Sequence, residues 1–238
     1  MPSEATAEPA HIGIVACSAE GAALCYTTIC TEAAAELGPH AHPEITMHTP
    51  SLAEYVACLG RGDLAGVGDL MLASAEKCAG AGADFLICPD NTIHQAMDHV
   101  LPRSPLPWLH IAEEAAAYAA ERGYRRLGLT GTRWLVASDV YPEKLTARGI
   151  DYVRPDDDEL AGMDTLIMNE LVNGVFTKDA AAFFRDVIQR MKDRDCDAVI
   201  LGCTEIPLIV DDGNAPLPTL DSTRILARAA LKRAVGGA

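Results

Sequence analysis

Two segments of the chain, DFLICPDNTI at residues 84–93 and DAVILGCTEI at residues 197–206, share one layout at an offset of 113 residues. Each reads as a hydrophobic strand, a short polar turn and the start of a helix. The alignment pairs three positions that bear polar or reactive side chains: Asp90 with Cys203, Asn91 with Thr204, and Thr92 with Glu205. Near-continuous hydrophobic strands are typical of parallel sheets covered on both faces, so the two segments predict two βα units of the same kind.

Two further pairs of segments repeat at nearly the same offset. GIVACSAEGAALCY (13–26) aligns with GLTGTRWLVASDVY (128–141), and LPWLHI (106–111) aligns with LPTLDS (217–222), which sets His110 opposite Asp221. Any two βα units resemble each other, so the shared offset carries the inference rather than any single pair. Three segments in one order predict two similar α/β halves.

Short apolar runs alternate with Ala-rich stretches along the rest of the chain. We predict strands at 11–16, 44–48, 84–88, 108–111, 127–130, 197–201 and 219–220, and helices that include 63–80, 112–122 and 180–194. This alternation is typical of an α/β protein with parallel sheets and right-handed crossovers. The acidic run at 156–159 predicts a solvated turn, and residues 1–10 predict a loose tail.

Composition excludes several classes of protein. The chain has 238 residues, is 49% hydrophobic and carries a formal charge of −15, which favours a globular protein over a disordered or fibrous one. The negative charge disfavours nucleic acid and anionic membrane surfaces, because both are polyanions. We find neither an export signal nor an apolar run long enough to span a bilayer, and we expect a cytoplasmic protein.

The cysteines and histidines do not have the spacing of metal ligands. None of the eight cysteines forms a Cys-x-x-Cys pair, so we expect free thiols in a reducing compartment and no zinc site. The chain also has no G-x-G-x-x-G after its first strand and no Walker lysine motif. These absences favour chemistry that needs neither a metal nor another cofactor.

Cys203, in the GCTEIP segment (202–207), is the first candidate for catalysis. It stands where a strand ends and a helix is expected to begin, and free backbone amides there would favour its thiolate form. A thiol at that point can act as a base or a nucleophile. The alternative is that Cys203 is one small buried residue among eight cysteines.

Asp90, in the CPDNTIH segment (88–94), is the second candidate. Ligands of open α/β sheets bind beyond the carboxyl ends of the strands, so the turns with Asp90 and Cys203 would face a ligand from opposite sides. Asp, Asn and Thr are also the usual helix caps, and this role remains open for Asp90, Asn91 and Thr92. His94 is more typical of a structural histidine, and Cys88 is a rival for the thiol of the cleft.

Polar turns after two other predicted strands suit the binding of a carboxylate. One holds Ser18, and the corresponding turn of the second half holds Thr130 and Thr132. Hydroxyls and backbone amides in such turns can hold an anion. They would serve equally well as plain connections.

Taken together, these residues resemble the aspartate/glutamate racemase family over most of the chain, from Ile12 to about Ser222. The matching pieces are GAGAD (80–84), DNTIH (90–94), LPWLHIAE (106–113), LGLTGTR (127–133), NELVNGVF (169–176) and LGCTEIPLI (201–209). The resemblance implies two flavodoxin-like α/β domains related by a pseudo-twofold axis, with the active site in the cleft between them. We expect the first domain at 11–113, the second at 114–221, and a C-terminal helix at 222–235 that returns to the first.

The resemblance also implies cofactor-independent racemisation of an acidic amino acid such as aspartate or glutamate by a homodimer. In the family two thiols flank the α-carbon, and one removes the proton that the other returns. Here Cys203 matches the second thiol, whereas Asp90 stands where the first cysteine usually precedes Asn-Thr, and Val172 replaces a lysine of some members. The matching positions imply that Asn91, Thr92, Thr132, Thr204 and Glu205 bind the substrate, beside Ser18 and Thr130, with His94 and His110 in support.

Two other functions stay open at this point. A cysteine without a second thiol also serves cofactor-free decarboxylases of the arylmalonate type, which are lyases that protonate an enediolate on one face. A non-catalytic binding protein on the same fold is the third alternative, and the intact GCTE segment argues against it.

Overall fold

The computed structural model describes residues 8–236, and its elements fall into two successive groups. The first group consists of β1 (Ile12–Val15), α1 (Ala19–Glu32), α2 (Ala34–Leu37), β2 (Ile45–His48), α3 (Leu52–Gly60), α4 (Leu64–Gly80), β3 (Phe85–Ile87), η1 (Thr92–Ala96), α5 (Met97–Val100), η2 (Leu101–Arg103) and β4 (Trp108–Leu109). The second consists of α6 (Ile111–Glu121), β5 (Arg126–Thr130), α7 (Arg133–Ala137), α8 (Val140–Thr146), β6 (Asp151–Val153), α9 (Asp157–Asn169), η3 (Leu171–Asn173), α10 (Lys178–Asp193), β7 (Ala198–Leu201), η4 (Ile206–Leu208), β8 (Thr219–Asp221) and α11 (Ser222–Gly236).

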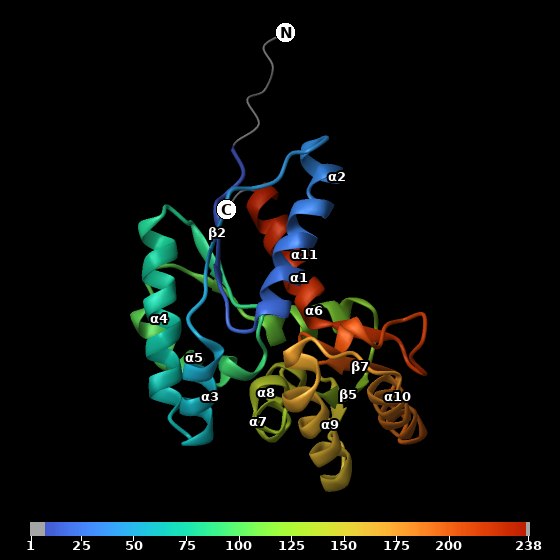
Figure 1. Cartoon of the computed structure of the whole chain (residues 1–238). Coiled ribbons are helices and arrows are strands. Elements are labelled where there is room, and N and C mark those ends of the chain that lie inside the picture. Colours follow the sequence, from blue (N-terminus) through green and yellow to red (C-terminus); the bar gives the residue numbers. More distant parts are fainter. Residues whose placement is uncertain (1–7, 237–238) are drawn as a thin grey trace.

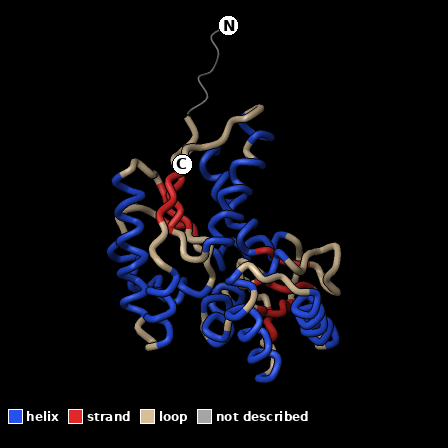
Figure 2. The backbone as a smooth tube through the Cα atoms, in the orientation of Figure 1, coloured by secondary structure: helices blue, strands red, loops and turns tan. Residues whose placement is uncertain are grey.

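The strands form two parallel four-stranded sheets with the same internal order. The first sheet runs β2-β1-β3-β4 and the second runs β6-β5-β7-β8, with every pair of neighbours parallel. This order is the one found in flavodoxin-like folds. Helices surround the strands of both halves (Figure 2). The predicted fold class, with two similar parallel-sheet halves, is confirmed.

Helices cover both faces of the first sheet. On one face, Leu226 and Ala230 of α11 share a buried cluster with Ile12 and Ile14 of β1, and α11 lies beside α1 (Figure 1). On the other face, α3 and α4 form a second cluster with residues such as Leu86. The C-terminal helix therefore packs on the half formed by the start of the chain.

Helix α6 lies across the predicted boundary between residues 113 and 114. It begins at Ile111, and its alanines pack against strand residues of the second sheet such as Leu127 and Ile200. It also contacts α11. The exact limits of the two domains stay a prediction.

Side-chain caps define where several helices begin. The hydroxyls of Ser18 and Thr177 and the carboxylate of Asp63 each accept a hydrogen bond from a backbone amide three residues on. Such caps satisfy amides that the first turn of a helix leaves free. The cap of α1 by Ser18 fixes the loop that carries Cys17, which bears on the site described below.

Three predictions about local structure need correction or comment. Asp156–Glu159 is not a solvated turn: Asp156 caps α9, and the Glu159 carboxylate accepts a hydrogen bond from the Asp156 amide, which completes a capping box. Strand β6 was not predicted, because it is a short edge strand without an apolar run. The predicted tail at 1–10 lies mostly outside the described residues, and Ala10 donates a backbone hydrogen bond to Ala234 at 2.9 Å.

Across residues 8–236, each helix is too short or too polar to span a membrane.

Candidate active site

A small cavity of about 50 Å³ lies where loops of the two halves meet. The loops that follow β1, β3, β5 and β7 all contribute to it, which is the edge of each sheet where ligands of such folds bind. Eight predicted site residues line it together: Ser18, Asp90, Asn91, Thr92, Thr132, Cys203, Thr204 and Glu205. Thr130, His94 and His110 are not part of this lining.

The wall built by the second half carries a thiol with a proton acceptor beside it. Cys203 donates a hydrogen bond to Oε2 of Glu205 at 2.9 Å, and Thr204 donates to the same oxygen at 2.9 Å. Both Cys203 and Glu205 are almost fully buried. Glu205 Oε1 is also buried and has no hydrogen-bond partner among the described residues. The wall therefore offers the thiol proton of Cys203 and one free acceptor, Glu205 Oε1.

The pKa of the Cys203 thiol is raised well above its usual value. Burial is the main cause, and the neighbouring Glu205 carboxylate adds to it. The prediction that a helix start favours the thiolate is therefore wrong. The element that follows is only the three-residue η4, and the Glu205 backbone amide does lower the pKa of this thiol, but burial and the Glu205 carboxylate outweigh it.

The wall built by the first half carries Asp90 and Cys17. Asp90 Oδ1 accepts a hydrogen bond from the Ile93 amide at 3.1 Å, so it does cap the following turn. Burial raises the pKa of Asp90, the Ile93 amide lowers it, and Glu205 raises it. A hydrogen bond from the Cys17 thiol lowers the pKa of Asp90 further. Asp90 is thus both a cap and a carboxyl whose proton affinity exceeds its usual value.

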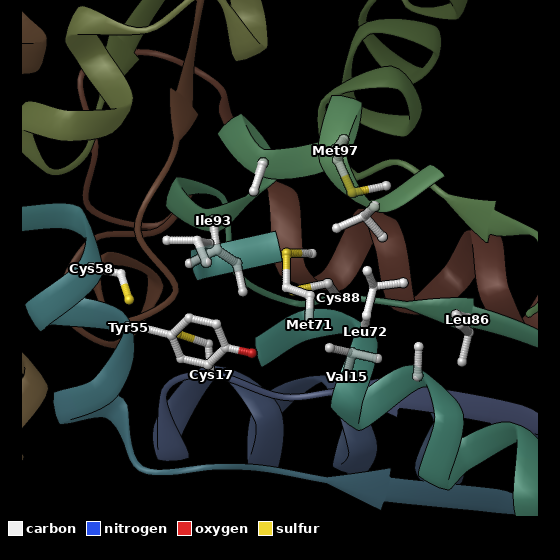
Figure 3. Packing of buried hydrophobic residues seen from close by; sticks show 14 of the residues in the cluster. Val15, Cys17, Tyr55, Cys58, Met71, Leu72, Leu86, Cys88, Ile93 and Met97 are labelled. Atoms are coloured by element: carbon white, nitrogen blue, oxygen red, sulfur yellow. The ribbon is translucent and has the colours of Figure 1, made fainter. Parts of the chain in front are cut away.

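Cys17 is a cavity residue that sequence reasoning did not place in the site. Its thiol is buried, and burial followed by the charge of Asp90 raises its pKa well above the usual value. Cys88, the predicted rival, belongs to the same buried cluster (Figure 3) but is absent from the cavity lining. The sequence does contain an indication that Cys17 lies at the cavity, since it directly precedes the capping residue Ser18 at the end of a buried strand.

Pairs of hydroxyls join the two walls. Ser18 Oγ lies 3.1 Å from Thr204 Oγ1, and Thr92 Oγ1 lies 3.0 Å from Thr132 Oγ1. Because Thr204 donates to Glu205, Ser18 donates to Thr204, and a chain of hydrogen bonds runs from the first half to Glu205. A substrate carboxylate that enters between the paired hydroxyls could accept hydrogen bonds from them in place of their present partners.

Asn91 ties the halves together through both ends of its amide. Its Oδ1 accepts a hydrogen bond from the Tyr141 hydroxyl at 2.6 Å, and its Nδ2 donates to Ser222 at 3.0 Å. Ser222 in turn donates to the Leu201 carbonyl at 3.0 Å. The amide lies at the cavity and is already oriented by residues of the second half.

The three predicted residues outside the lining make structural contacts. His94 Nδ1 donates to the Asp90 carbonyl at 2.6 Å while its Nε2 accepts from the Ile111 amide, and burial lowers its pKa to about 4. His110 caps α6 and packs edge-on against His94. Thr130 donates to the Ile200 carbonyl at 2.7 Å. His94 therefore holds the backbone of the Asp90 turn.

Within residues 8–236, His, Cys, Asp and Glu side chains do not gather in groups of three or more that could hold a metal ion.

Two flavodoxin-like halves that meet at a cavity with opposed polar walls define a class of two-domain α/β proteins. A profile of the Asp/Glu/hydantoin racemase family matches residues 12–230, and the chain belongs to that family. The relatives described in the next paragraph carry the names of racemases, which are isomerases. The predicted family and enzyme class are therefore confirmed. These relatives do not favour the decarboxylase alternative.

Individual relatives agree with this assignment. The broad specificity amino-acid racemase RacX of Bacillus subtilis (strain 168) is 23% identical over 158 residues, which cover 65% of this chain and 66% of RacX. A candidate Asp/Glu racemase from Yersinia pestis has a similar crystal structure, with a TM-score of 0.85, 29% identity, and coverage of 95% of this chain and 99% of that one. An aspartate racemase homologue from Pyrococcus horikoshii OT3 gives a TM-score of 0.79 and 25% identity, with 93% and 97% covered.

Proposed function

We propose that this protein is a cofactor-independent racemase that moves the α-proton of an amino acid between its two faces. One observation carries the proposal: Cys203, held against Glu205, and Asp90 line one cavity from different halves of the molecule. A proton carrier on each side of the α-carbon is the arrangement that inversion requires. Reacting atoms would need to approach the carbon to roughly 3–3.5 Å from each side.

The raised pKa values of Asp90 and Cys203 indicate which group takes the proton and which gives it. The raised pKa of Asp90 makes its carboxylate a stronger base than a free carboxylate, and the raised pKa of Cys203 favours its protonated thiol. Asp90 takes the α-proton, and the electrons of the broken C–H bond enter the carboxylate as an enediolate. The S–H proton of Cys203 then forms a new C–H bond on the other face, leaving a thiolate beside Glu205.

The weak acidity of the α-proton is the main barrier, and fixed donors around the substrate carboxylate would lower it. Hydroxyls of Ser18, Thr92 and Thr132 would donate to the carboxylate while negative charge develops on it. The free acceptor Oε1 of Glu205 would accept from the ammonium group. In reverse, the Cys203 thiolate removes the proton and Asp90 returns it.

Three finer points stay proposals. The family resemblance favours an acidic side chain on the substrate, whereas the broad specificity printed for RacX favours no single type. All eight cysteines are unpaired, which supports a reducing compartment such as the cytoplasm. A homodimer remains a prediction, which light scattering of the purified protein tests.

Exchange in D₂O tests the proposed reaction. Incubation with L-amino acids should replace the α-hydrogen by deuterium and produce the D-enantiomer, measured by proton NMR and chiral chromatography. Cys203→Ser should abolish formation of the D-enantiomer, because a hydroxyl is far less acidic than a thiol, whereas Asp90 alone could still exchange the α-hydrogen with retention. Cys25→Ser is the matched control, since Cys25 is an equally buried thiol outside the cavity. A Cys203→Ser variant that folds and retains racemisation would contradict the proposal, as would loss of activity in Cys88→Ser alone.

A further inference from the structure

Much of the cavity lining that the proposed proton transfer does not use is apolar. It includes Leu52, Val56 and Leu59 of α3 from the first half, and Trp134, Met168 and Val172 from the second. Trp134 packs against the same hydrophobic cluster as α3, and Met168 and Val172 pack against the cluster that contains Cys203. These side chains line the same cavity as the acid–base residues and together give it an apolar surface.

The ionisable side chains of the lining are all acidic. They are the carboxyls of Asp90 and Glu205, the thiols of Cys17 and Cys203 and the phenol of Tyr55, and the described lining contains no Lys, Arg or His. A second substrate carboxylate would enter this space without a cationic partner and would meet like charges. Burying an unpaired carboxylate is strongly unfavourable.

Hydrogen-bonding groups fix which end of the substrate meets which wall. Glu205 is 2% exposed, and its unpartnered Oε1 requires a donor such as an ammonium group. The hydroxyls of Thr92, Thr132 and Ser18 are donors suited to the α-carboxylate. With both polar groups of the α-carbon placed there, the side chain of the substrate is left to the apolar surface.

We propose that the site selects amino acids with an uncharged, apolar side chain, such as leucine or methionine, over aspartate and glutamate. This inference rests on the proposed racemase function for its catalytic readout. The apolar surface supplies favourable burial to an aliphatic side chain, and a carboxylate gains nothing there. The cationic side chain of lysine would also lose its hydration against this surface.

A comparison of rates for single amino acids tests the preference directly. The rate of α-deuteration in D₂O is measured for L-leucine, L-methionine, L-lysine, L-aspartate and L-glutamate with the wild-type protein. We expect kcat/KM for leucine or methionine to exceed that for aspartate and glutamate by about 100-fold, the scale set by an unpaired buried carboxylate. Equal or faster exchange of aspartate or glutamate would overturn the inference and leave the racemase proposal standing.

A charge variant tests the physical cause. Val172→Lys places an ammonium group at the apolar surface and should shift the ratio of kcat/KM values toward aspartate or glutamate by at least about tenfold. Val172→Met, of similar length and without charge, is the matched control and should keep the preference for leucine. A ratio that changes equally in both variants would show that charge does not set the specificity.

Binding separates this inference from the proposed function. 2-Methylleucine and 2-methylaspartate lack an α-hydrogen, so calorimetry with them reports affinity without turnover. Tighter binding of 2-methylleucine supports the specificity, even in a protein that exchanges no α-hydrogen and so fails as a racemase. Tighter binding of 2-methylaspartate, or binding of neither compound, would overturn it.

Discussion

Asp90 can act as a helix cap or as a catalytic base, and substitution distinguishes the two roles. Its Oδ1 accepts from the Ile93 amide, which an asparagine at the same position would also do. Only the carboxyl can carry a proton, and burial raises its pKa toward the range where a base is effective. Asp90→Asn should therefore lower α-deuteration at least about 100-fold, the scale of lost general-base catalysis. Exchange by NMR together with thermal melts measures both effects, and full activity in the Asn variant would show that Asp90 is only a cap.

The same pKa shift predicts how stability depends on pH. The folded pKa of Asp90 lies above its unfolded value, so its contribution to stability is full below the unfolded pKa and is lost as pH rises through the folded pKa. At neutral pH the ionised group therefore disfavours folding. Asp90→Asn should match or exceed the wild-type melting temperature at pH 7 and lose this advantage in acid. A lower melting temperature at pH 7 would contradict the assigned shift.

Cys17 influences Asp90 from the same wall of the cavity. Its thiol hydrogen bond lowers the pKa of Asp90, so removal of that donor should raise this pKa. We expect Cys17→Ala to move the acidic limb of the kcat/KM profile to higher pH, because more of Asp90 is then protonated at a given pH. Cys17→Ser keeps a donor and should leave the limb near its wild-type position. An unchanged profile in Cys17→Ala would mean that Cys17 only packs against its neighbours.

At the scale of elements, buried strands were the easiest to predict. β1, β3 and β7 are buried along their whole length, and each reads as an unbroken apolar run. β6 escaped prediction because Asp151 and Tyr152 of this edge strand are exposed or partly so. The start of α9 escaped because an acidic run resembles a turn, although Asp-x-x-Glu is also a capping box.

The capping box of α9 makes a quantitative prediction at this scale. Asp156 accepts from the Glu159 amide, and Asp156→Ala should lower the free energy of unfolding by about 1 kcal/mol, the usual value of such a cap. Asp158→Ala is the control, because Asp158 is exposed on the first turn and caps nothing. Urea denaturation measures the difference, and equal losses in the two variants would contradict the role of the cap. Activity should persist, since Ile167 and Met168 lie at the other end of α9.

At the scale of the molecule, the internal repeat predicted which loops meet but not all the side chains that line the cavity. The shared offset set the turns of Asp90 and Cys203 opposite each other, and both line the cavity. Cys17 was not among the predicted site residues, and Val172 was indicated only by the family resemblance, because strand and helix periodicity describes each half alone. Contacts between the halves depend on how the two sheets pack, which no local pattern encodes.

One connection of this kind is the network around Asn91. Tyr141, Asn91 and Ser222 are all nearly inaccessible to solvent, and together they link the β3 loop to α8 and to the start of α11. Tyr141→Phe would leave Asn91 Oδ1 buried without its donor, at a cost of about 1–3 kcal/mol in the free energy of unfolding.

The internal repeat itself supplies the control for this last prediction. Tyr26 is the counterpart of Tyr141 in the first half, yet it is 42% exposed. Tyr26→Phe should therefore change stability by less than about 0.5 kcal/mol. Urea denaturation followed by circular dichroism gives both values. Comparable losses in the two variants would mean that the Asn91 network does not hold the halves together, and that other contacts, such as those of α11 with α6, do so.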